Sequence, residues 1–365
     1  MMNSELNNLN EYEALRKQYR LLPVKVSSFY KKKVAREVEA LGHINGPLHR
    51  VVYPSLEKNS LKPEYEVADF IDDRSHMPEV ANTSFMHKYA NRVLFLPLSI
   101  CLSNCMYCFR QDVLEEKKIK PNSEKASGLE ENLQALIEYL NSHSEVNEVI
   151  LSGGDPMMLP ANKLRFIFEN IVKKTKVQNL RIHTRSIIFD PKSMTEQHIQ
   201  CLVDYKVRTV FHIVHPYEIC SEVRIVIDQL RNKGLRLYNQ FPILRKVNDH
   251  VAVLTKLLFL LDELNIKNLS IFFPEPVHYS ASFRINFKRL FSLIDEFNQS
   301  TPSWINSTRF CQDTILGKVR LENLIEYNEE KGYAIFARKG KEIKVPDHPE
   351  KLDVPGELKT LLWED

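Results

Sequence analysis

The sequence predicts an α/β fold with short, apolar and mainly parallel strands. Through the middle of the chain, apolar runs alternate with segments of helical periodicity, which is the pattern of repeated strand–helix–strand units. A doubly wound sheet and a barrel both satisfy this alternation. The expected strands are RVLFLPLSI (92–100), EVILS (148–152), LRIHTR (180–185), RTVFHIV (208–214), LRLYNQ (235–240) and NLSIFF (268–273).

The segments between these runs carry apolar residues at the three- and four-residue spacing of one helix face. Such faces are expected to pack against the sheet. The three clearest stripes are Leu129, Leu133, Leu136, Ile137 and Leu140; Leu164, Ile167, Phe168 and Ile171; and Leu254, Leu257, Leu258 and Leu261.

Polar and reactive residues follow each expected strand. In a parallel α/β barrel the chemistry gathers at the carboxyl ends of the strands. This coincidence favours one concave site, formed by Cys101, Ser152 to Asp155, Arg185, His215, Gln240 and Glu275.

Composition sets broad limits. The chain has 365 residues, of which 43% are hydrophobic and 27% charged, and these proportions are ordinary for a globular enzyme. The net charge of +3 argues neither for nor against nucleic acid, and we expect no nucleic-acid partner. The basic run KKKVAR (31–36) is interpreted as a solvated helix face. No apolar run approaches the roughly 20 residues that span a bilayer, and the polar N-terminus lacks the apolar core of a signal peptide. We therefore expect a cytoplasmic protein with no membrane partner.

Three of the six cysteines, Cys101, Cys105 and Cys108, lie within eight positions directly after the first expected strand. Three thiolates on a tight loop can bind three irons of a cubane cluster and leave the fourth iron open for catalysis. The alternative, structural zinc, needs four closed ligands, and no fourth Cys or His stands at a familiar short spacing. A [4Fe–4S] cluster is the favoured interpretation. The other cysteines are scattered singly and are expected to be small core residues.

A second motif follows the second expected strand. Ser152-Gly153-Gly154-Asp155-Pro156 permits close backbone approach through its glycines, and its acid can complement an ammonium group. Taken alone, it could also be a tight strand-to-helix turn.

The C-x3-C-x2-C spacing closely resembles that of the radical S-adenosylmethionine (SAM) superfamily. The resemblance narrows to the lysine 2,3-aminomutase family, including its members that make β-lysine for elongation factor P, and runs from about residue 65 to 345. The matching segments are MHKYANRVLFLPLSICLSNCMYCFRQ, VILSGGDPMML, LRIHTR, HIVHPYEI, YNQFPILRKVND and DTILGKVRLENLIEYNEEKGYAIFARKG.

This resemblance implies a partial (β/α)6 TIM-like radical SAM barrel over residues 86–285. A mostly helical extension (1–85) would precede it, and an α+β segment (286–365) would follow. The family cleaves SAM at the open iron to form a radical that removes hydrogen from the substrate β-carbon, after which the amino group migrates to that carbon. The residues implied for the SAM region are Tyr107, Ser152, Gly153, Gly154, Asp155, Arg185 and Gln240, with His212 and His215 as secondary candidates.

The family also carries pyridoxal phosphate (PLP). Lys88 and Arg92 stand where the family places its phosphate-binding cations, and Lys318 corresponds to the lysine that binds PLP covalently and acts in catalysis. Most members precede that lysine with a run of glycines, whereas this chain has Thr314-Ile315-Leu316.

The implied substrate is an α-amino acid. Arg110 matches the family's clamp for the substrate carboxylate, a role that suits the two parallel hydrogen bonds of a guanidinium. Glu275 and Asp313 approximate the two acids that recognise a cationic side chain.

Two alternatives stay open. One is a dehydratase, epimerase or mutase that uses SAM without PLP, and the other is a non-catalytic protein with a structural cluster or zinc. The implied electron donor is a flavodoxin or ferredoxin. The sequence leaves the oligomeric state open, homo-oligomers included.

Overall fold

The computed structural model describes residues 2–79, 84–117 and 127–364. One sheet contains eight strands in chain order, and every neighbouring pair is parallel except the antiparallel pair β1–β2. Its strands are β1 (Phe85–Tyr89), β2 (Arg92–Phe95), β3 (Glu148–Leu151), β4 (Asn179–Thr184), β5 (Arg208–Phe211), β6 (Leu237–Pro242), β7 (Lys267–Phe272) and β8 (Arg309–Cys311).

All six expected strands are present, and the expectation missed two. β1 reads FMHKY and β8 only RFC, so neither is long enough to show a period of its own. Within the described ranges no ladder joins β1 to β8, so the sheet stays open, as a partial barrel does. The sheet also continues beyond residue 285 through β8, and the division into three domains stays a prediction.

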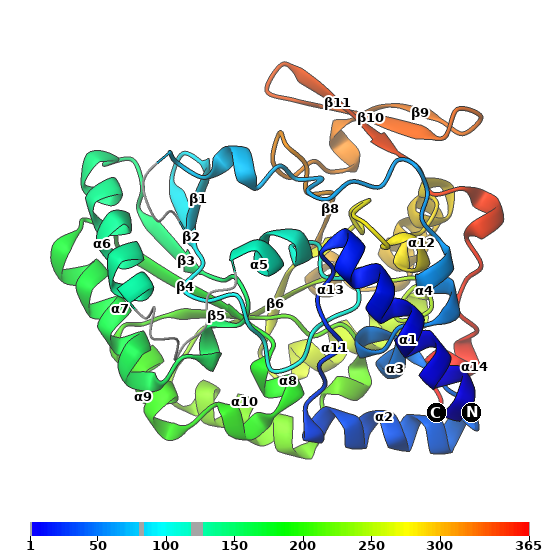
Figure 1. Ribbon diagram of the computed structural model, residues 1–365, viewed down its shortest axis with the longest axis horizontal. Coiled ribbons are helices and arrows are strands. Elements are labelled where there is room, and N and C mark those ends of the chain that lie inside the picture. The colour runs from blue at the N-terminus through cyan, green and yellow to red at the C-terminus, as the bar shows by residue number, and fades with distance from the viewer. Residues whose placement is uncertain (1, 80–83, 118–126, 365) are drawn as a thin grey trace.

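Helices cover the outer face of the sheet. Figure 1 shows α6, α7, α9 and α10 following one another in an arc outside the strands, and α6 packs on α7, which packs on α9. The helices are α1 (Met2–Tyr19), α2 (Ser28–Leu41), α3 (Pro47–Val52), α4 (Leu56–Ser60), α5 (Gln111–Lys117), α6 (Ser127–Ser142), α7 (Ala161–Lys174), α8 (Ser186–Phe189), α9 (Glu196–Asp204), α10 (Ser221–Asn232), α11 (Val251–Glu263), α12 (Phe287–Ser300), α13 (Ser303–Asn306) and α14 (Leu358–Leu361).

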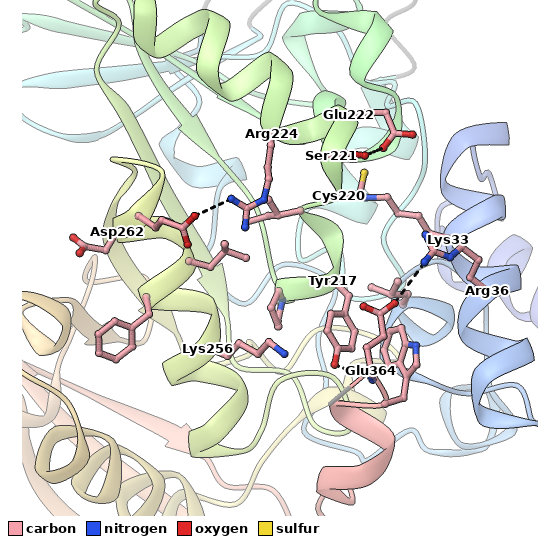
Figure 2. A pocket seen from close by; sticks show the side chains of 17 residues that line it. Lys33, Arg36, Tyr217, Cys220, Ser221, Glu222, Arg224, Lys256, Asp262 and Glu364 are labelled. Carbon is pink, nitrogen blue, oxygen red and sulfur yellow. Dashed lines mark hydrogen bonds and ion pairs between the residues drawn. The ribbon is translucent and has the colours of Figure 1, made fainter.

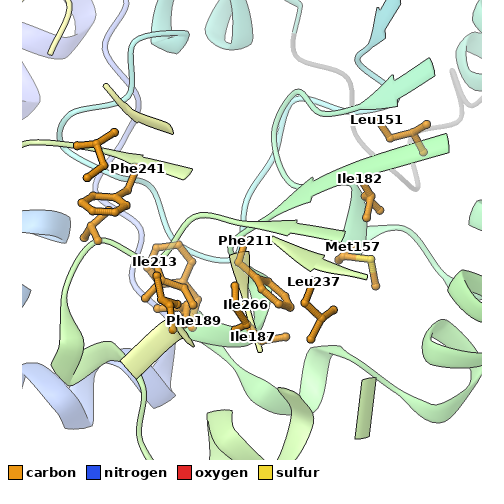
Figure 3. Close-up of a cluster of buried hydrophobic side chains, with 14 of the residues drawn as sticks. Leu151, Met157, Ile182, Ile187, Phe189, Phe211, Ile213, Leu237, Phe241 and Ile266 are labelled. Atoms are coloured by element: carbon orange, nitrogen blue, oxygen red, sulfur yellow. The ribbon is translucent and has the colours of Figure 1, made fainter. Parts of the chain in front are cut away.

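The core lies between these helices and the sheet. The apolar stripe expected on α7 is buried along its whole length, as is the stripe on α11. Strand residues such as Ile182, Phe211 and Leu237 meet Ile187 and Phe189 of α8 in the same apolar cluster (Figure 3). Each such side chain stabilises the fold by about 1.5–3 kcal/mol when fully buried.

Two further parts flank the barrel. Helices α1 to α4 form the N-terminal extension, which matches the expected fold class. Near the other end of the chain, an antiparallel sheet stands at the edge of the molecule in Figure 1, with strands β9 (Leu324–Asn328), β10 (Tyr333–Arg338) and β11 (Lys341–Pro346).

Over the part of the chain that the structure describes, no helix combines the length and apolar character that crossing a membrane requires.

Candidate active site

One cavity of about 630 Å³ opens on the inner face of the sheet. Side chains from all eight strands line it, so the sheet curves around a single hollow. All the residues that the sequence predicts for the site except His215 lie on its wall: Cys101, Cys105, Cys108, Tyr107, Ser152, Gly153, Gly154, Asp155, Arg185, His212, Gln240, Lys88, Arg92, Lys318, Arg110, Glu275 and Asp313.

The two glycines of the SGGDP motif allow the cysteine loop to approach closely. A Cβ at Gly154 would lie 2.2 Å from the carbonyl oxygen of Ile100, and Gly153 has a φ of +114°. Gly154 N donates to Leu98 O at 3.0 Å, and Asp155 N donates to Ile100 O at 2.8 Å. A larger residue at Gly154 would therefore push away the segment that leads into Cys101.

The N-terminal extension holds the same loop from another side. Lys25 Nζ donates to Cys101 O at 2.6 Å, and Asn104 donates from its backbone to Lys25 O. Met106 N donates to Val51 O at 2.8 Å. These contacts fix the loop before any ligand binds, which is how a metal site is kept in geometry.

All three cysteine thiols are free and half-buried. Burial, and after it the Cys105 thiol, raise the pKa of Cys108 to about 12, and burial raises the pKa values of Cys101 and Cys105 as well. The thiols are therefore neutral until a cationic centre arrives to take them as thiolates. Three such donors on one loop fit an iron–sulfur cluster.

The carboxylate of Asp155 is already hydrogen-bonded to other residues of the protein. Its carboxylate accepts hydrogen bonds from Thr184 Oγ1 at 2.7 Å, Arg185 N at 2.8 Å and Met157 N at 3.0 Å. It thereby ties the loop after β3 to the end of β4. Contact between Asp155 and SAM stays a prediction.

Arg185 and Tyr107 belong to a buried network that the sequence did not predict. Arg185 donates to the Tyr107 hydroxyl and to Glu218, and Tyr30 also donates to Glu218, at 2.9 Å. His212 Nε2 lies 3.1 Å from the Tyr107 hydroxyl. Glu218 is fully buried, so an uncompensated charge there would be costly without Arg185. The motif HPYE was visible in the sequence, but its partner Tyr30 lies 188 residues away.

The two secondary histidines have different positions. His212 lines the cavity. His215 is instead buried outside it, where its Nε2 lies 3.0 Å from Leu361 O and its ring stacks on Trp363. His215 is therefore a structural residue at a strand end, where protein groups provide its hydrogen bond and its stacking contact.

Arg110 is held by an acid that the sequence did not single out. Its Nε donates to Asp73 Oδ2 at 2.7 Å, and its Nη1 lies 3.5 Å from Ser152 Oγ. Both Arg110 and Asp73 are largely withdrawn from solvent. Both residues line the cavity, so Asp73 orients the Arg110 guanidinium within the cavity wall.

Lys318 emerges from a tight turn built without a glycine run. Thr314 Oγ1 donates to Gly317 O at 2.6 Å, and Gln312 pairs with Val319 on either side. The Lys318 backbone N–H donates to the Tyr89 hydroxyl at 3.2 Å, and its Nζ lies 4.4 Å from the centre of the Phe272 ring. Burial lowers the pKa of Lys318 from its ordinary value. A lowered pKa favours the neutral amine that bonds covalently to an aldehyde.

Glu275 and Asp313 form the acidic part of the cavity. Burial, with Asp313 as the next cause, raises the pKa of Glu275 to about 8. Lys88 Nζ lies 3.8 Å from Asp313 Oδ1 and donates to Ile71 O at 2.9 Å. That Asp313 oxygen is buried and accepts no hydrogen bond from the described residues. Arg110 and Lys318 also act electrostatically on Glu275, so the acids share their cations with the rest of the cavity wall.

Further cations line the end of the cavity near the strand starts. Arg92 stacks on the Tyr89 ring at 3.8 Å, and Arg181 pairs with Glu148 at 2.7 Å. Arg309 and Arg320 lie on the same wall. An anionic group such as a phosphate would be stabilised there.

Gln240 lies near His183 on the cavity wall, with 3.4 Å between Gln240 Nε2 and His183 Nδ1. Burial lowers the pKa of His183 well below its ordinary value, so the ring is neutral.

A second, larger cavity of about 930 Å³ lies between α2, α10 and α11. Figure 2 shows Arg36 of α2 and Arg224 of α10 on its walls, and these cations pair with Glu364 and Glu263. As far as the described residues go, none of the predicted site residues lines it, so we assign the site to the smaller cavity.

A group of potential metal ligands also lies away from the cavity. Donor atoms of His87, His143 and Glu145 lie within 4.8 Å of one another. Both ring nitrogens of His87 already have protein partners, the Tyr139 hydroxyl at 2.7 Å and Ala90 O at 3.2 Å. We therefore assign no metal to this group.

Comparison with known proteins identifies the family. A model of the 4Fe-4S single cluster domain matches residues 91–213. L-lysine 2,3-aminomutase of Buchnera aphidicola is 33% identical over 229 residues, which cover 62% of this chain and 65% of the relative. The Escherichia coli enzyme of the same name is 30% identical over 247 residues, covering 67% of this chain and 68% of the relative. The matched regions thus span about two thirds of these relatives.

Among solved structures, a radical SAM methyltransferase from Sphaerobacter thermophilus is 12% identical with a TM-score of 0.43, covering 64% of this chain and 72% of that one. The family assignment depends on the sequence relatives together with the cluster-domain match. The chain therefore belongs to the lysine 2,3-aminomutase family of radical SAM enzymes.

Proposed function

We propose that this protein is a PLP-dependent amino acid 2,3-aminomutase that moves the α-amino group of a cationic amino acid to the β-carbon. The observation that carries the proposal is convergence. Three free cysteines, a half-buried lysine and two acids from distant parts of the chain line one cavity. The names of the relatives from Buchnera aphidicola and Escherichia coli support the same reaction class.

Three groups would bind here, and this chain offers donors for each. Cys101, Cys105 and Cys108 would ligate the cluster, and Ser152 to Gly154 would present backbone polar groups to SAM. When bound, the cluster, SAM and PLP supply the electron, the radical and the electron delocalisation that amino-group migration needs.

The protein's part is to position PLP and the substrate and to exclude water. Lys318 would hold PLP, with Lys88, Arg92 and their neighbouring arginines balancing the phosphate charge. Arg110, oriented by Asp73, would grip the substrate carboxylate through two parallel hydrogen bonds. A closed cavity strengthens each of these charge interactions because water is kept out.

Glu275 and Asp313 would receive the positive end of the substrate side chain. Lys88 lies 3.8 Å from Asp313, and Lys318 and Arg110 are further cations near Glu275. With Lys318 bonded to PLP and Arg110 holding the substrate carboxylate, Lys88 would be the one cation left to face two acids, and a cationic side chain would balance the second. This favours lysine, ornithine or arginine over a neutral amino acid.

The test is an anaerobic assay of reconstituted protein with lysine, ornithine, arginine and leucine as separate substrates. We expect an isomer of at least one cationic amino acid, separable by chromatography at unchanged mass, and none from leucine. Borohydride should fix PLP to the protein, and Lys318→Ala should abolish that fixation. Cleavage of SAM without bound PLP or any isomer would contradict the proposal and favour a PLP-independent radical SAM enzyme.

A further inference from the structure

The segment from Ala14 to Arg36, here called the basic segment, has a charge composition unlike the rest of the chain. It holds eight Lys and Arg residues and no Asp or Glu. Because the whole chain has 50 basic and 47 acidic residues, the remainder is net acidic. The cations are Arg16, Lys17, Arg20, Lys25, Lys31, Lys32, Lys33 and Arg36.

The basic segment lies directly against the cysteine loop. Lys25 Nζ is 2.6 Å from Cys101 O, and Asn104 donates to Lys25 O and Pro23 O. Ser27, which caps the start of α2, donates from its backbone to Ser103 Oγ at 2.9 Å. Lys25 itself does not line the cavity. The segment therefore separates the cysteine loop from part of the outer surface.

Its cations remain largely uncompensated. Lys25, Lys31 and Lys32 are exposed, and no salt bridge joins any of them to a carboxylate within residues 2–79, 84–117 and 127–364. One cation is closely paired, since Arg16 lies 2.5 Å from Glu13, whereas the other pairs are long, with Arg20 3.8 Å from Glu116 and Arg36 3.9 Å from Glu364. Exposed pairs of this kind contribute little.

We propose that the basic segment is the docking surface for an acidic protein that delivers single electrons to the cluster. This inference rests on the proposed function, because only a redox-active cluster needs such a partner. SAM and the substrate would fill the cavity on one side of the cysteine loop, so an electron carrier must approach by another side. A cationic surface on that side attracts an anionic partner and orients it on encounter.

A nucleic acid is the other polyanion that cations could attract. Single-stranded nucleic acids bind through exposed aromatic rings on which bases stack. In the basic segment the Tyr30 ring is fully buried, and Phe29 is covered by Lys33 Nζ at 5.1 Å. The third ring, Tyr19, packs edge-on against Tyr279 and is covered by Lys62 Nζ at 4.6 Å. Charge without a free stacking ring disfavours a single-stranded nucleic acid, and an acidic protein is the partner that the test below examines against RNA.

The test compares two reductants in the same SAM-cleavage assay. Lys31→Glu with Lys32→Glu reverses two exposed charges one turn from the Ser27 contact, while Lys25 is left intact because it holds the loop. With reduced flavodoxin, formation of 5′-deoxyadenosine should slow by about tenfold or more at low salt, and the difference should shrink as salt screens the charges. With dithionite, which needs no docking, the rate should equal that of the unchanged protein.

Lys173→Glu with Lys174→Glu is the matched control, since both lysines are exposed near the end of α7. This variant should behave like the unchanged protein with both reductants. Equal flavodoxin-driven rates of 5′-deoxyadenosine formation in the α2 and α7 variants would overturn the proposed docking surface. A lower dithionite-driven rate in the α2 variant alone would overturn it too. A binding loss for RNA but not for flavodoxin would overturn it in favour of nucleic acid. If the unchanged protein fails to cleave SAM with dithionite, the proposed function fails as well.

Discussion

The two ends of the cavity differ in how far the protein satisfies its own polar groups. At the cysteine end, both charged groups are paired: Asp155 accepts from Thr184, Arg185 and Met157, and Arg185 is paired with Glu218, with only its Nε lacking a hydrogen bond from the described residues. At the lysine end, Asp313 keeps a buried oxygen without a hydrogen bond from the described residues, and Glu275 has a pKa raised to about 8.

This difference separates framework from binding groups. A satisfied network stays in place whether or not a ligand is present, so it can hold a cysteine loop in register. Groups short of partners are costly in the folded protein and gain the most when a ligand supplies the missing charge. We infer that the cysteine end is organised before ligands bind and that the lysine end is completed by them.

The largest effect is expected at the cysteine end. Cys105→Ala removes one of three ligands to the cluster, so iron content should fall well below about four per chain and SAM cleavage should drop to background. Iron analysis and 5′-deoxyadenosine release measure the two effects. Cys201→Ala is the control, because that buried thiol lies outside the cavity and should leave both values unchanged.

Lys318→Ala should abolish PLP binding at the lysine end of the cavity and leave the cluster at the cysteine end intact. We expect loss of covalently held PLP and of amino acid isomerisation, with iron content and uncoupled SAM cleavage retained, because Lys318 contacts Tyr89 and Phe272 rather than the cysteine loop. Borohydride fixation and product analysis provide the readout, with Lys359→Ala, an exposed lysine on α14, as the control. A simultaneous loss of iron would show that the two ends are not independent.

The same contrast explains what the sequence could reveal. Six strands, the cysteine loop and SGGDP are local patterns, and each was found where expected. The residues that orient the site were missed because their partners are distant in the chain. Tyr89 and Lys318 are 229 residues apart, and Asp73 and Arg110 are 37 apart.

The fold shows the same limit. β8 has three residues and carries no periodic signal, so only its pairing with β7 reveals it as a strand. The importance of Asp155 was expected, but its hydrogen bonds to Thr184 and Arg185 were not, since these residues lie at and just after the end of the next strand, β4.

Glu275→Gln tests whether the acid pair reads a cation. Because burial and Asp313 raise the pKa of Glu275 to about 8, its carboxyl is mostly protonated at pH 7 and becomes charged as the pH rises. The KM for a cationic amino acid should therefore fall by up to about tenfold per pH unit below pH 8 and level off above it. The Gln variant should show a flatter profile with a higher KM at pH 9. An unchanged profile would remove Glu275 from substrate recognition.

The smallest effect concerns the turn before Lys318. Thr314 replaces a glycine run by donating its hydroxyl to Gly317 O at 2.6 Å, while Gly317 takes a φ of +89° against the Tyr89 ring. Thr314→Ala removes that hydrogen bond in a buried place, so unfolding free energy should fall by about 1–3 kcal/mol. Thr314→Ser keeps the hydroxyl and should restore most of the loss. Denaturant unfolding gives the stability, and borohydride fixation shows whether Lys318 still faces the cavity. If the turn is set mainly by the 312–319 pairing, PLP fixation will survive in both variants; loss of fixation in Ala but not Ser would show that the threonine itself aims the lysine.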